Sequence, residues 1–331
     1  MEPIGGQARI PRISVVLCTY NGGRFLKEQL ESVALQSRLP AEVVVCDDGS
    51  VDETLDLLRQ FRSRASFPVH ITKNPQRLGT TKNFEQAINL ASGEFIALCD
   101  QDDLWAPGKL ERLSQVMETS PFVGAVFSDA NLIDGNSKPI GKCLFAKHKF
   151  SSVKQRRFLS DPPTTLLKHD VVTGATLMFR ASMRRFCLPI PGSWVHDGWL
   201  TWKISLHSRL GLVAEPLISY RVHSGQQLGV GPLNGVSSTN ADTETRRRHY
   251  ARVARQFEDL LRDLLSEGWN PQEPLVTKIR EKIKFLMRQS MLSQSLAVRT
   301  LQVTGQLHSY LHYARGIASL RTDLLLRREM P

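Results

Sequence analysis

The chain has 331 residues, 41% of them hydrophobic, and a formal net charge of +11 at pH 7. This composition excludes an intrinsically disordered protein, because it supplies enough apolar side chains for one large core or two. No apolar run reaches the roughly 18 residues that span a bilayer, and residues 1–12 lack the apolar core of an export signal. The positive charge favours an anionic partner: a nucleotide, a nucleic acid or an anionic membrane surface.

The five cysteines do not form a disulfide framework. Cys18, Cys46 and Cys99 fall in predicted buried strands, where thiols behave as small apolar groups, and no CxxC pair is present. This use of cysteine predicts a protein of the reducing cytoplasm.

The first third of the chain alternates short apolar runs with amphipathic stretches. The runs predict strands at residues 13–18, 43–46, 69–72 and 95–99, and the stretches predict helices at 24–34, 53–61 and 80–92. Repeated strand–helix alternation is typical of a parallel sheet with helical crossovers. The strand at 95–99 is apolar throughout, which indicates burial on both faces.

Polar residues follow these strands directly. Residues 19–21 (TYN) end the first strand, residues 47–50 (DDGS) end the second, and Asp100, Asp102 and Asp103 follow the fourth. In an open α/β sheet, ligands bind beyond the carboxyl ends of the strands. Clustered carboxylates there favour a cation or a metal-bound polyphosphate as ligand; the alternative is an acidic turn that caps the helix predicted at 108–119.

The alternation continues less regularly beyond residue 119. We predict strands at 123–127, 171–179 and 212–220, a helix at 198–207, and an irregular loop over the site at 134–169. Residues 225–240 are rich in Gly, Ser and Asn and predict a loop or linker, whereas 243–328 are basic and helical in pattern. These features divide the chain into residues 1–235 and 236–331.

Each candidate binding residue can also be explained by an ordinary structural role. The Asp48 carboxylate could accept a hydrogen bond from the N–H of a nucleotide base, or it could belong to a simple Asp-Gly turn. Lys82 could bind a phosphate, or it could be a solvated surface lysine. Asp197 suits a general base or a helix N-cap. His223 suits a metal or phosphate contact, although most single histidines have neither role.

Taken together, the motifs are more specific than any one of them. The segments VVLCTYNG, VVVCDDGSVDET, KNPQRLGTTKNF, ALCDQDDLWAPGKL, HDGWL and YRVHSGQ occur in this order. In this order they resemble family 2 glycosyltransferases over about residues 12–230, and the rhamnosyltransferase-like enzymes of bacterial surface polysaccharide synthesis in particular. The resemblance implies an α/β GT-A fold, a Rossmann-like mixed sheet flanked by helices, here followed by a C-terminal helical extension.

The same resemblance implies roles for individual residues. Asp197 would be the catalytic base, and Asp102, with His223, would hold Mg²⁺ or Mn²⁺. The residues implied to contact the nucleotide are Thr19, Tyr20, Asn21, Asp48, Lys82 and Asp100. The residues implied to contact the acceptor are Asp103, Trp105 and His196. His196 departs from the family pattern, in which a glutamate is commoner before the aspartate.

The implied reaction is inverting transfer of a sugar from a dTDP- or UDP-sugar to a hydroxyl of a saccharide or lipid-linked saccharide, as in O-antigen or capsule synthesis. We expect a cytoplasmic enzyme, with the C-terminal helices either on the inner membrane face or in a homo-oligomer, and no nucleic-acid partner. A haloacid-dehalogenase-like phosphatase and an inactive sugar-nucleotide-binding protein are the alternatives. The phosphatase would carry its DxD near the start of the chain.

Overall fold

The computed structural model describes residues 10–226 and 243–326 and separates into two compact units. The first unit comprises Met1–Gln155, Val172–Ile190 and Val195–Arg221. The second comprises Arg156–Val171, Pro191–Trp194 and Val222–Pro331. The predicted boundary between residues 235 and 236, and most of the predicted linker, lie outside the described residues.

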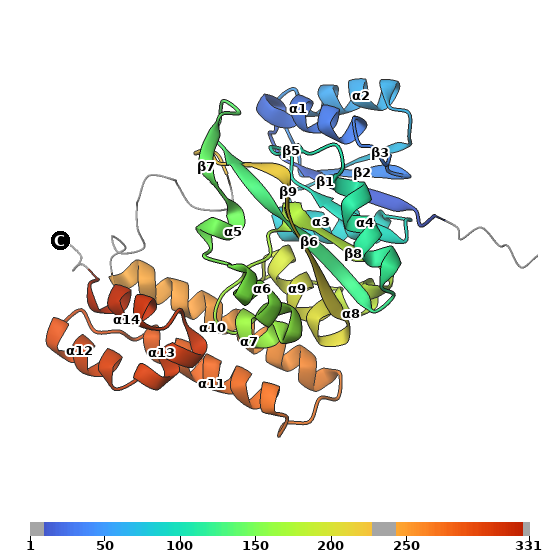
Figure 1. The fold of residues 1–331 in the computed structure, drawn as a ribbon. Coiled ribbons are helices and arrows are strands. Elements are labelled where there is room, and N and C mark those ends of the chain that lie inside the picture. Colours follow the sequence, from blue (N-terminus) through green and yellow to red (C-terminus); the bar gives the residue numbers. More distant parts are fainter. Residues whose placement is uncertain (1–9, 227–242, 327–331) are drawn as a thin grey trace, which may run out of the picture. The chain divides into compact units, whose positions relative to one another are not determined.

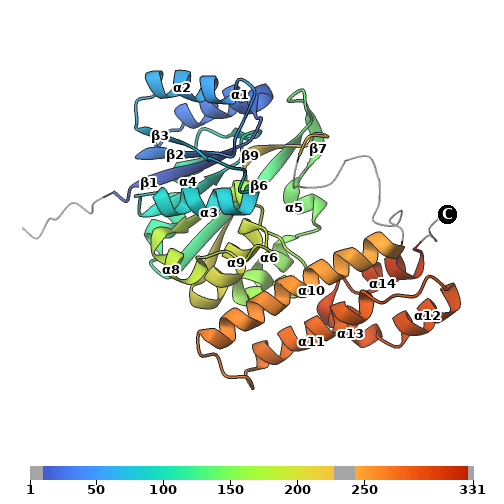
Figure 2. The same cartoon turned by 180° about the vertical axis from the view of Figure 1, so that it is seen from behind.

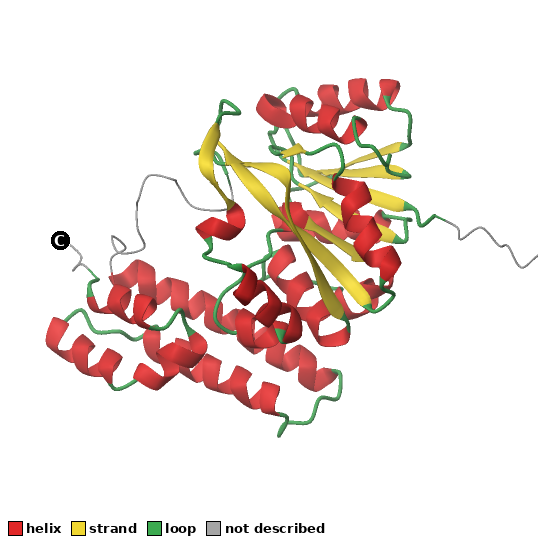
Figure 3. Cartoon of the chain, viewed as in Figure 1, coloured by secondary structure: helices red, strands yellow, loops and turns green. Residues whose placement is uncertain are grey.

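A mixed sheet of nine strands, counted over the described residues, forms the first unit (Figures 1 and 3). Its order is β3-β2-β1-β4-β8-β6-β9-β5, and β7 pairs with β6. The strands are β1 Ile13–Thr19, β2 Glu42–Asp47, β3 Val69–Lys73, β4 Phe95–Cys99, β5 Leu104–Trp105, β6 Val123–Ile133, β7 Pro139–Cys143, β8 Leu177–Arg180 and β9 Arg209–Arg221.

The half of the sheet from β3 to β4 is parallel, as the strand–helix alternation predicts. Every residue of β1, β2 and β4 is buried, because helices cover both faces. The helices of this unit are α1 Gly23–Ala34, α2 Thr54–Arg64, α3 Thr80–Leu90, α4 Lys109–Thr119, α5 Leu144–Lys147, α8 Arg184–Cys187 and α9 His196–His207. Figure 1 shows α4 in front of the sheet, and Figure 2, from behind, shows α3 on the opposite face.

The other half of the sheet is where the sequence prediction fails. Both β4 and β6 pair antiparallel with β8. The strand predicted at 171–179 is shorter, since Gly174–Thr176 form a 3-10 turn (η1) before β8. The irregular loop predicted at 134–169 is wrong: it holds β7, α5, α6 (Ser152–Ser160) and α7 (Pro162–Leu166). Strand β7 escaped prediction because it is short, contains Pro and Gly and is largely exposed, so it shows no alternation of apolar and polar residues.

In the second unit, α7 is accompanied by five further helices, drawn orange to red in Figure 1. They are α10 Thr243–Ser266, α11 Pro274–Gln289, α12 Leu296–Thr304, α13 Leu307–Tyr313 and α14 Ile317–Leu324. Buried Asp323 accepts hydrogen bonds from the hydroxyls of Tyr250 (2.5 Å) and Tyr310 (2.6 Å). It also forms an ion pair with Arg246 (2.9 Å). No helix within residues 10–226 and 243–326 combines the length and apolar character that crossing a membrane requires.

Candidate active site

The carboxyl ends of β1, β2 and β4 lie along one edge of the sheet. In the parallel register Thr19 lies beside Asp47, and Leu17 lies beside Cys99. The residues that follow the three strands therefore gather at this edge, the usual ligand-binding edge of an open α/β sheet.

Asp47 is buried and folds the turn that follows β2. Its Oδ2 accepts hydrogen bonds from the hydroxyls of Thr19 (2.8 Å) and Ser50 (2.5 Å), and its Oδ1 accepts from the backbone N–H of Ser50 (2.9 Å). Gly49 lies within this turn at φ 86°, a conformation that favours glycine. Thr19, a predicted nucleotide contact, thus uses its hydroxyl to brace the turn.

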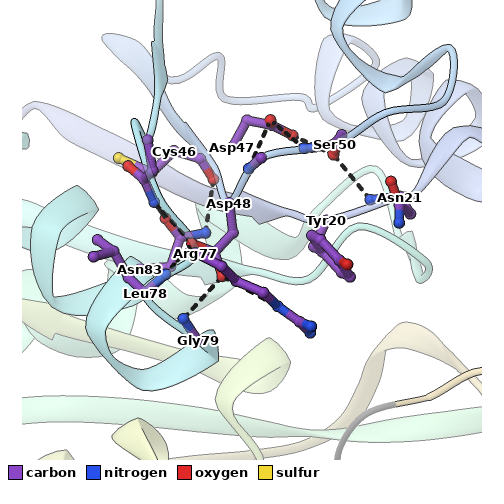
Figure 4. Close-up of polar contacts among 12 residues, drawn as sticks. Tyr20, Asn21, Cys46, Asp47, Asp48, Ser50, Arg77, Leu78, Gly79 and Asn83 are labelled. Atoms are coloured by element: carbon purple, nitrogen blue, oxygen red, sulfur yellow. Dashed lines mark hydrogen bonds and ion pairs between the residues drawn. The ribbon is translucent and has the colours of Figure 1, made fainter.

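Asp48 points the other way and holds the loop before α3 (Figure 4). Its Oδ1 accepts from the side chain of Asn74 (3.0 Å) and from the backbone N–H of Leu78 (2.6 Å), and its Oδ2 accepts from Gly79 N–H (2.9 Å). A carboxylate has about four acceptor positions, so one remains for a ligand donor. In the structure, Asp48 therefore orders the loop before α3, and its contact with a nucleotide base remains a prediction.

The Tyr20 ring faces the same loop. The guanidinium of Arg77 lies 3.9 Å from the ring centroid, so a base that stacks on this face must displace or share that arginine (Figure 4). Gln101 fixes the Tyr20 backbone, accepting from its N–H (2.9 Å) and donating to its carbonyl (3.1 Å). Asn21, at φ 47°, accepts from Val51 N–H (3.0 Å), so its side chain also braces the β2 turn.

Arg221 supports the acidic loop from behind. Its guanidinium is buried, with Nε donating to the Asp102 carbonyl (2.6 Å) and Nη2 to Glu28 (2.9 Å). Its backbone N–H donates to Asp103 Oδ1 (2.9 Å). The end of β9 is therefore bonded directly to the loop that carries Asp102.

Two residues of the predicted acceptor site lie inside the protein. Asp103 has no exposed surface, and its Oδ2 has no hydrogen-bond partner within the described structure. Trp105 is 4% exposed, belongs to β5, and carries the Lys109 ammonium 3.6 Å from its ring centroid. Because both side chains are buried, the acceptor contact predicted for them does not fit this structure; they support the loop instead.

Asp197 lies in the first turn of α9 and is held by backbone donors. Its Oδ2 accepts from Gly174 N–H (3.0 Å) in η1, and its Oδ1 accepts from Gly198 N–H (2.7 Å). The Lys109 ammonium donates to the carbonyl of Ala175, the residue after Gly174 in η1 (2.6 Å). The turn η1 thus connects Asp197 with the buried cation at the start of α4.

His196, the residue before Asp197, is also buried. Its ring stacks on Phe84 with centroids 3.9 Å apart, and neither ring nitrogen has a partner in the part of the chain that the structure describes. Burial lowers the pKa of His196, while Asp197 opposes that shift. At 4% exposure the ring does not reach an acceptor, so the contact predicted for it also does not fit this structure.

The electrostatics connect the acids from three elements. Burial, then the charges of Asp102 and Asp197, raise the pKa of Asp100 to about 7. Burial likewise raises the pKa of Asp103 well above its usual range and lowers the pKa of Lys109 to about 7. Asp197 of α9 is therefore close enough to oppose ionisation of Asp100 after β4.

This acidic group fits a metal ion that arrives with its substrate. Within residues 10–226 and 243–326, no three His, Cys, Asp or Glu side chains are arranged to hold a metal by themselves. Mg²⁺ is commonly bound by one or two carboxylates together with substrate phosphates. Asp100 and Asp102 supply two mutually repelling carboxylates at a strand end, a donor set of that kind.

The remaining predicted residues are placed as follows. Lys82 donates to Glu85 (2.8 Å) and to the Ile190 carbonyl (2.7 Å), so a donor phosphate would compete for its ammonium. His223 lies two residues beyond β9, in the second unit, where its Nδ1 accepts from Gly225 N–H (3.2 Å). The predicted roles of both residues remain predictions.

Sequence reasoning missed the residues that hold this edge together: Asp47, Gln101, Lys109, Gly174 and Arg221. Most lie inside the motifs that carry the resemblance, yet their side chains point inward and their roles depend on contacts between distant segments. One available signal was a buried cation: Arg221 ends an apolar strand, and a fully buried arginine needs several acceptors.

One half of the sheet is parallel, and in the other half β8 runs antiparallel to β4 and β6 while β6 and β9 are parallel. This mixed sheet, with carboxylates at the edge of its parallel half, defines an enzyme of the nucleotide-sugar transferase class. The family model for glycosyl transferase family 2 matches residues 14–186. An uncharacterized glycosyltransferase of Nostoc sp. is 28% identical over 251 residues, 73% of this chain and 72% of that protein. Another from Methanocaldococcus jannaschii is 26% identical over 222 residues, 66% of this chain and 73% of that protein.

Solved structures agree in fold. Mannosyltransferase PcManGT from Pyrobaculum calidifontis, in complex with GDP-Man and Mn²⁺, aligns with a TM-score of 0.56 at 18% identity, covering 95% of this chain and 84% of that one. Residues 1–349 of TarS from S. aureus, in complex with UDP, align with a TM-score of 0.54 at 17% identity, covering 95% and 88%. The chain belongs to glycosyl transferase family 2. The predicted GT-A fold with C-terminal helices is confirmed, and the phosphatase alternative is excluded, since the acidic motif follows the fourth strand.

Proposed function

We propose that this chain is an inverting, divalent-metal-dependent glycosyltransferase that uses a nucleotide-diphosphate sugar and a hydroxyl of a saccharide or lipid-linked saccharide. The observation that carries this proposal is the contact between β4, the strand that Asp100 and Asp102 follow, and η1, whose Gly174 N–H holds Asp197. We infer from this contact that Asp197 faces a group of acids suited to a metal-bound diphosphate. The family and fold support the donor class.

The donor would lie along the edge formed by β1, β2 and the loop before α3. Its base would stack on Tyr20, with Arg77 displaced or shared, and a base N–H would take the acceptor position left on Asp48. A pyrimidine base suits these contacts, so dTDP- or UDP-sugars are the proposed donors. Structures similar in fold carry UDP, UDP-GlcNAc or GDP-Man, which supports the donor class and leaves the base for experiment.

The diphosphate would face Asp100 and Asp102. A bound Mg²⁺ or Mn²⁺ ion supplies charge stabilisation for the departing diphosphate as a Lewis acid. Asp102 would be its ligand, with His223 as a further candidate, and Asp100 would contact the ribose or metal-bound water. Arg221 fixes the Asp102 backbone, which limits how far this carboxylate can move.

Asp197 would act as the base. The acceptor hydroxyl gives its proton to Asp197 while its oxygen bonds to the anomeric carbon, and the bond from that carbon to the diphosphate oxygen breaks with its electron pair. One displacement of this kind inverts the anomeric configuration. Two backbone N–H groups orient the carboxylate toward this role as general base.

The acceptor and the sugar are the finer parts of the proposal. The rhamnosyltransferase-like form of the motifs favours a deoxyhexosyl or hexosyl donor and a role in O-antigen or capsule synthesis. Because Asp103, Trp105 and His196 are buried, we assign acceptor recognition to other side chains around Asp197.

The test is a screen of nucleotide sugars by thermal stabilisation, followed by transfer assays with the stabilising donor and Mg²⁺ or Mn²⁺. Asp102→Asn should reduce transfer roughly 10²-fold or more, while Asp56→Asn, an exposed carboxylate of α2, should leave it unchanged. Full activity of Asp102→Asn in EDTA refutes the metal role. Tight donor binding without turnover across many acceptors would support the inactive binding protein instead.

A further inference from the structure

The second unit exposes large apolar side chains to an unusual degree. Over the described residues, eighteen large hydrophobic side chains are exposed, and nine of them lie between residues 287 and 325. They are Met287, Met291, Leu296, Val298, Leu301, Leu307, Leu311, Ile317 and Leu325. Leu301 is 74% exposed and Ile317 is 69% exposed, so these are not partly covered core residues.

Six of the nine side chains belong to three short neighbouring helices, and Met287, Met291 and Leu325 lie in α11, before α12 and after α14. Helix α14 packs against both α12 and α13. In α13 the buried side chains are Tyr310 and Tyr313, which leaves Leu307 and Leu311 on the outward side at helical spacing, with His308 and His312 between them. We call residues 287–325 the α12–α14 surface.

The charge of this surface has one sign. From residue 282 to 326 the sole acidic residue is Asp323, which is fully buried and bonded to Arg246. The exposed ionisable side chains in the same stretch are Lys284, Arg288, Arg315 and Arg321, with the two histidines. The neighbouring acid Glu281 is exposed and accepts a hydrogen bond from the Tyr313 hydroxyl of α13. A surface that is apolar and has an excess of exposed cations suits an anionic partner with an apolar core.

We propose that the α12–α14 surface binds the chain to an anionic lipid bilayer, with the leucine, isoleucine and methionine side chains entering the acyl boundary. A second copy of the chain fits less well, because its surface would bring the same positive charges together. A nucleic acid fits less well too, since the exposed apolar side chains include no aromatic ring for base stacking.

This assignment refines the membrane prediction made from the sequence. Residues 243–328 are basic as a whole and include three consecutive arginines at 246–248, but Arg246 binds Asp323 and Arg247 donates to the Leu292 carbonyl (2.7 Å). Two of the three are thus engaged inside the helical unit. The cations available to lipid headgroups lie instead on α11, α14 and the turn before α14.

The test measures partition of the full chain onto vesicles that contain about one third phosphatidylglycerol, with pure phosphatidylcholine vesicles as reference. Leu301→Gln/Leu311→Gln/Ile317→Gln should lower partition more than tenfold. Arg288→Gln/Arg321→Gln should lower it roughly tenfold or more on anionic vesicles at low salt and have little effect on neutral ones.

The matched control variants replace exposed leucines and exposed cations of the first unit by glutamine. Leu35→Gln/Leu39→Gln/Leu90→Gln alters three exposed leucines, and Lys27→Gln/Arg62→Gln removes two exposed cations. Both should partition as the native chain does. Equal losses in the controls, or no binding of the native chain at low salt, overturn the proposal.

Light scattering measures the oligomeric state and so tests the alternative that this surface is a contact between copies of the chain. An oligomer of the native chain that the triple leucine–isoleucine variant breaks, with no vesicle binding, would make this surface a contact between copies and refute the lipid assignment. Vesicle binding requires neither donor nor turnover, so Asp197→Asn should partition like the native chain. Failure of the proposed reaction is therefore distinguishable from failure of this inference.

Discussion

The Asp197 carboxylate is oriented by hydrogen bonds and still has acceptor positions open for a further donor. One backbone N–H donates to each of its oxygens, from Gly174 and from Gly198, and each oxygen keeps a further acceptor position. Its orientation therefore depends on backbone contacts with η1 and α9 rather than on another side chain. The sequence alternative, a plain helix N-cap, does not describe this arrangement, because the Gly174 donor comes from outside α9.

The first prediction concerns this base. Asp197→Asn keeps the shape of the side chain but removes its basicity, so turnover should fall roughly 10²–10⁴-fold with donor affinity little changed. Transfer kinetics together with donor titration measure the two quantities. A variant that lost donor binding and kept its turnover would make Asp197 a binding residue.

Arg221 carries the second prediction at this scale. Its guanidinium bonds at once to the Asp102 carbonyl, Glu28 and the Ser137 hydroxyl (2.8 Å), a branched set that a lysine ammonium cannot reproduce. Arg221→Lys should lower activity about 10- to 100-fold and raise the metal concentration needed for half-maximal rate.

The control for Arg221→Lys is Arg24→Lys. Arg24 donates to the Gly135 carbonyl in the same β6–β7 turn, but it is exposed and does not touch the acidic loop. It should retain native kinetics. If Arg221→Lys lost stability but kept its metal dependence, Arg221 would be a structural residue without influence on Asp102.

At the scale of elements, η1 interrupts what the sequence presents as one strand at 171–179. The apolar run VVTGATLMF contains a glycine whose role lies outside the run. A Cβ on Gly174 would lie 2.9 Å from His196 Nε2 and 3.3 Å from Asp197 Cβ, so the close approach of η1 to α9 requires glycine here. Contacts of this kind join segments about 20 residues apart, and periodicity cannot reveal them.

Gly174→Ala tests this close approach. The added methyl should displace the start of α9 and lower turnover at least tenfold, while donor binding changes little, because Tyr20 and Asp48 make no contact with η1 or α9 among the hydrogen bonds of the described residues. Gly192→Ala is the control, because a Cβ there meets no atom within 4 Å. Equal turnover in the two alanine variants would show that α9 adapts and that η1 does not position the base.

The parallel half of the sheet was predictable because its strands are fully buried and its crossovers are amphipathic helices. The mixed half was not, since β7 is a short, exposed strand that contains Pro and Gly, and β5 has two residues. The acidic strand end was also visible in the sequence. Its supporting residues were not, because Lys109 turns back on it from the start of the next helix and Arg221 reaches it from a strand end distant in the chain.

For the molecule as a whole, buried lysines make stability depend on pH. Lys282, in α11, donates to the Tyr313 carbonyl (2.5 Å), and burial lowers its pKa to about 7. An unfolded lysine titrates near pH 10.4, so between these values the unfolded chain holds a proton that the folded chain has released. Stability therefore rises with pH from about 7 upward, by about 1 kcal/mol per pH unit for this group.

Lys282→Met removes that group and should lower the slope of unfolding free energy between pH 7 and about 8, measured by urea denaturation, while Lys109, whose pKa burial also lowers to about 7, keeps its own contribution. The window stops there because burial raises the pKa of Cys46 to about 11, and such thiols lower stability once the unfolded thiol ionises above about pH 8.5. Lys284→Met, two residues on and exposed, should keep the native slope. The lost hydrogen bond to Tyr313 shifts the free energy equally at each pH, so the slope reports ionisation alone, and identical slopes in both variants would contradict a neutral buried lysine.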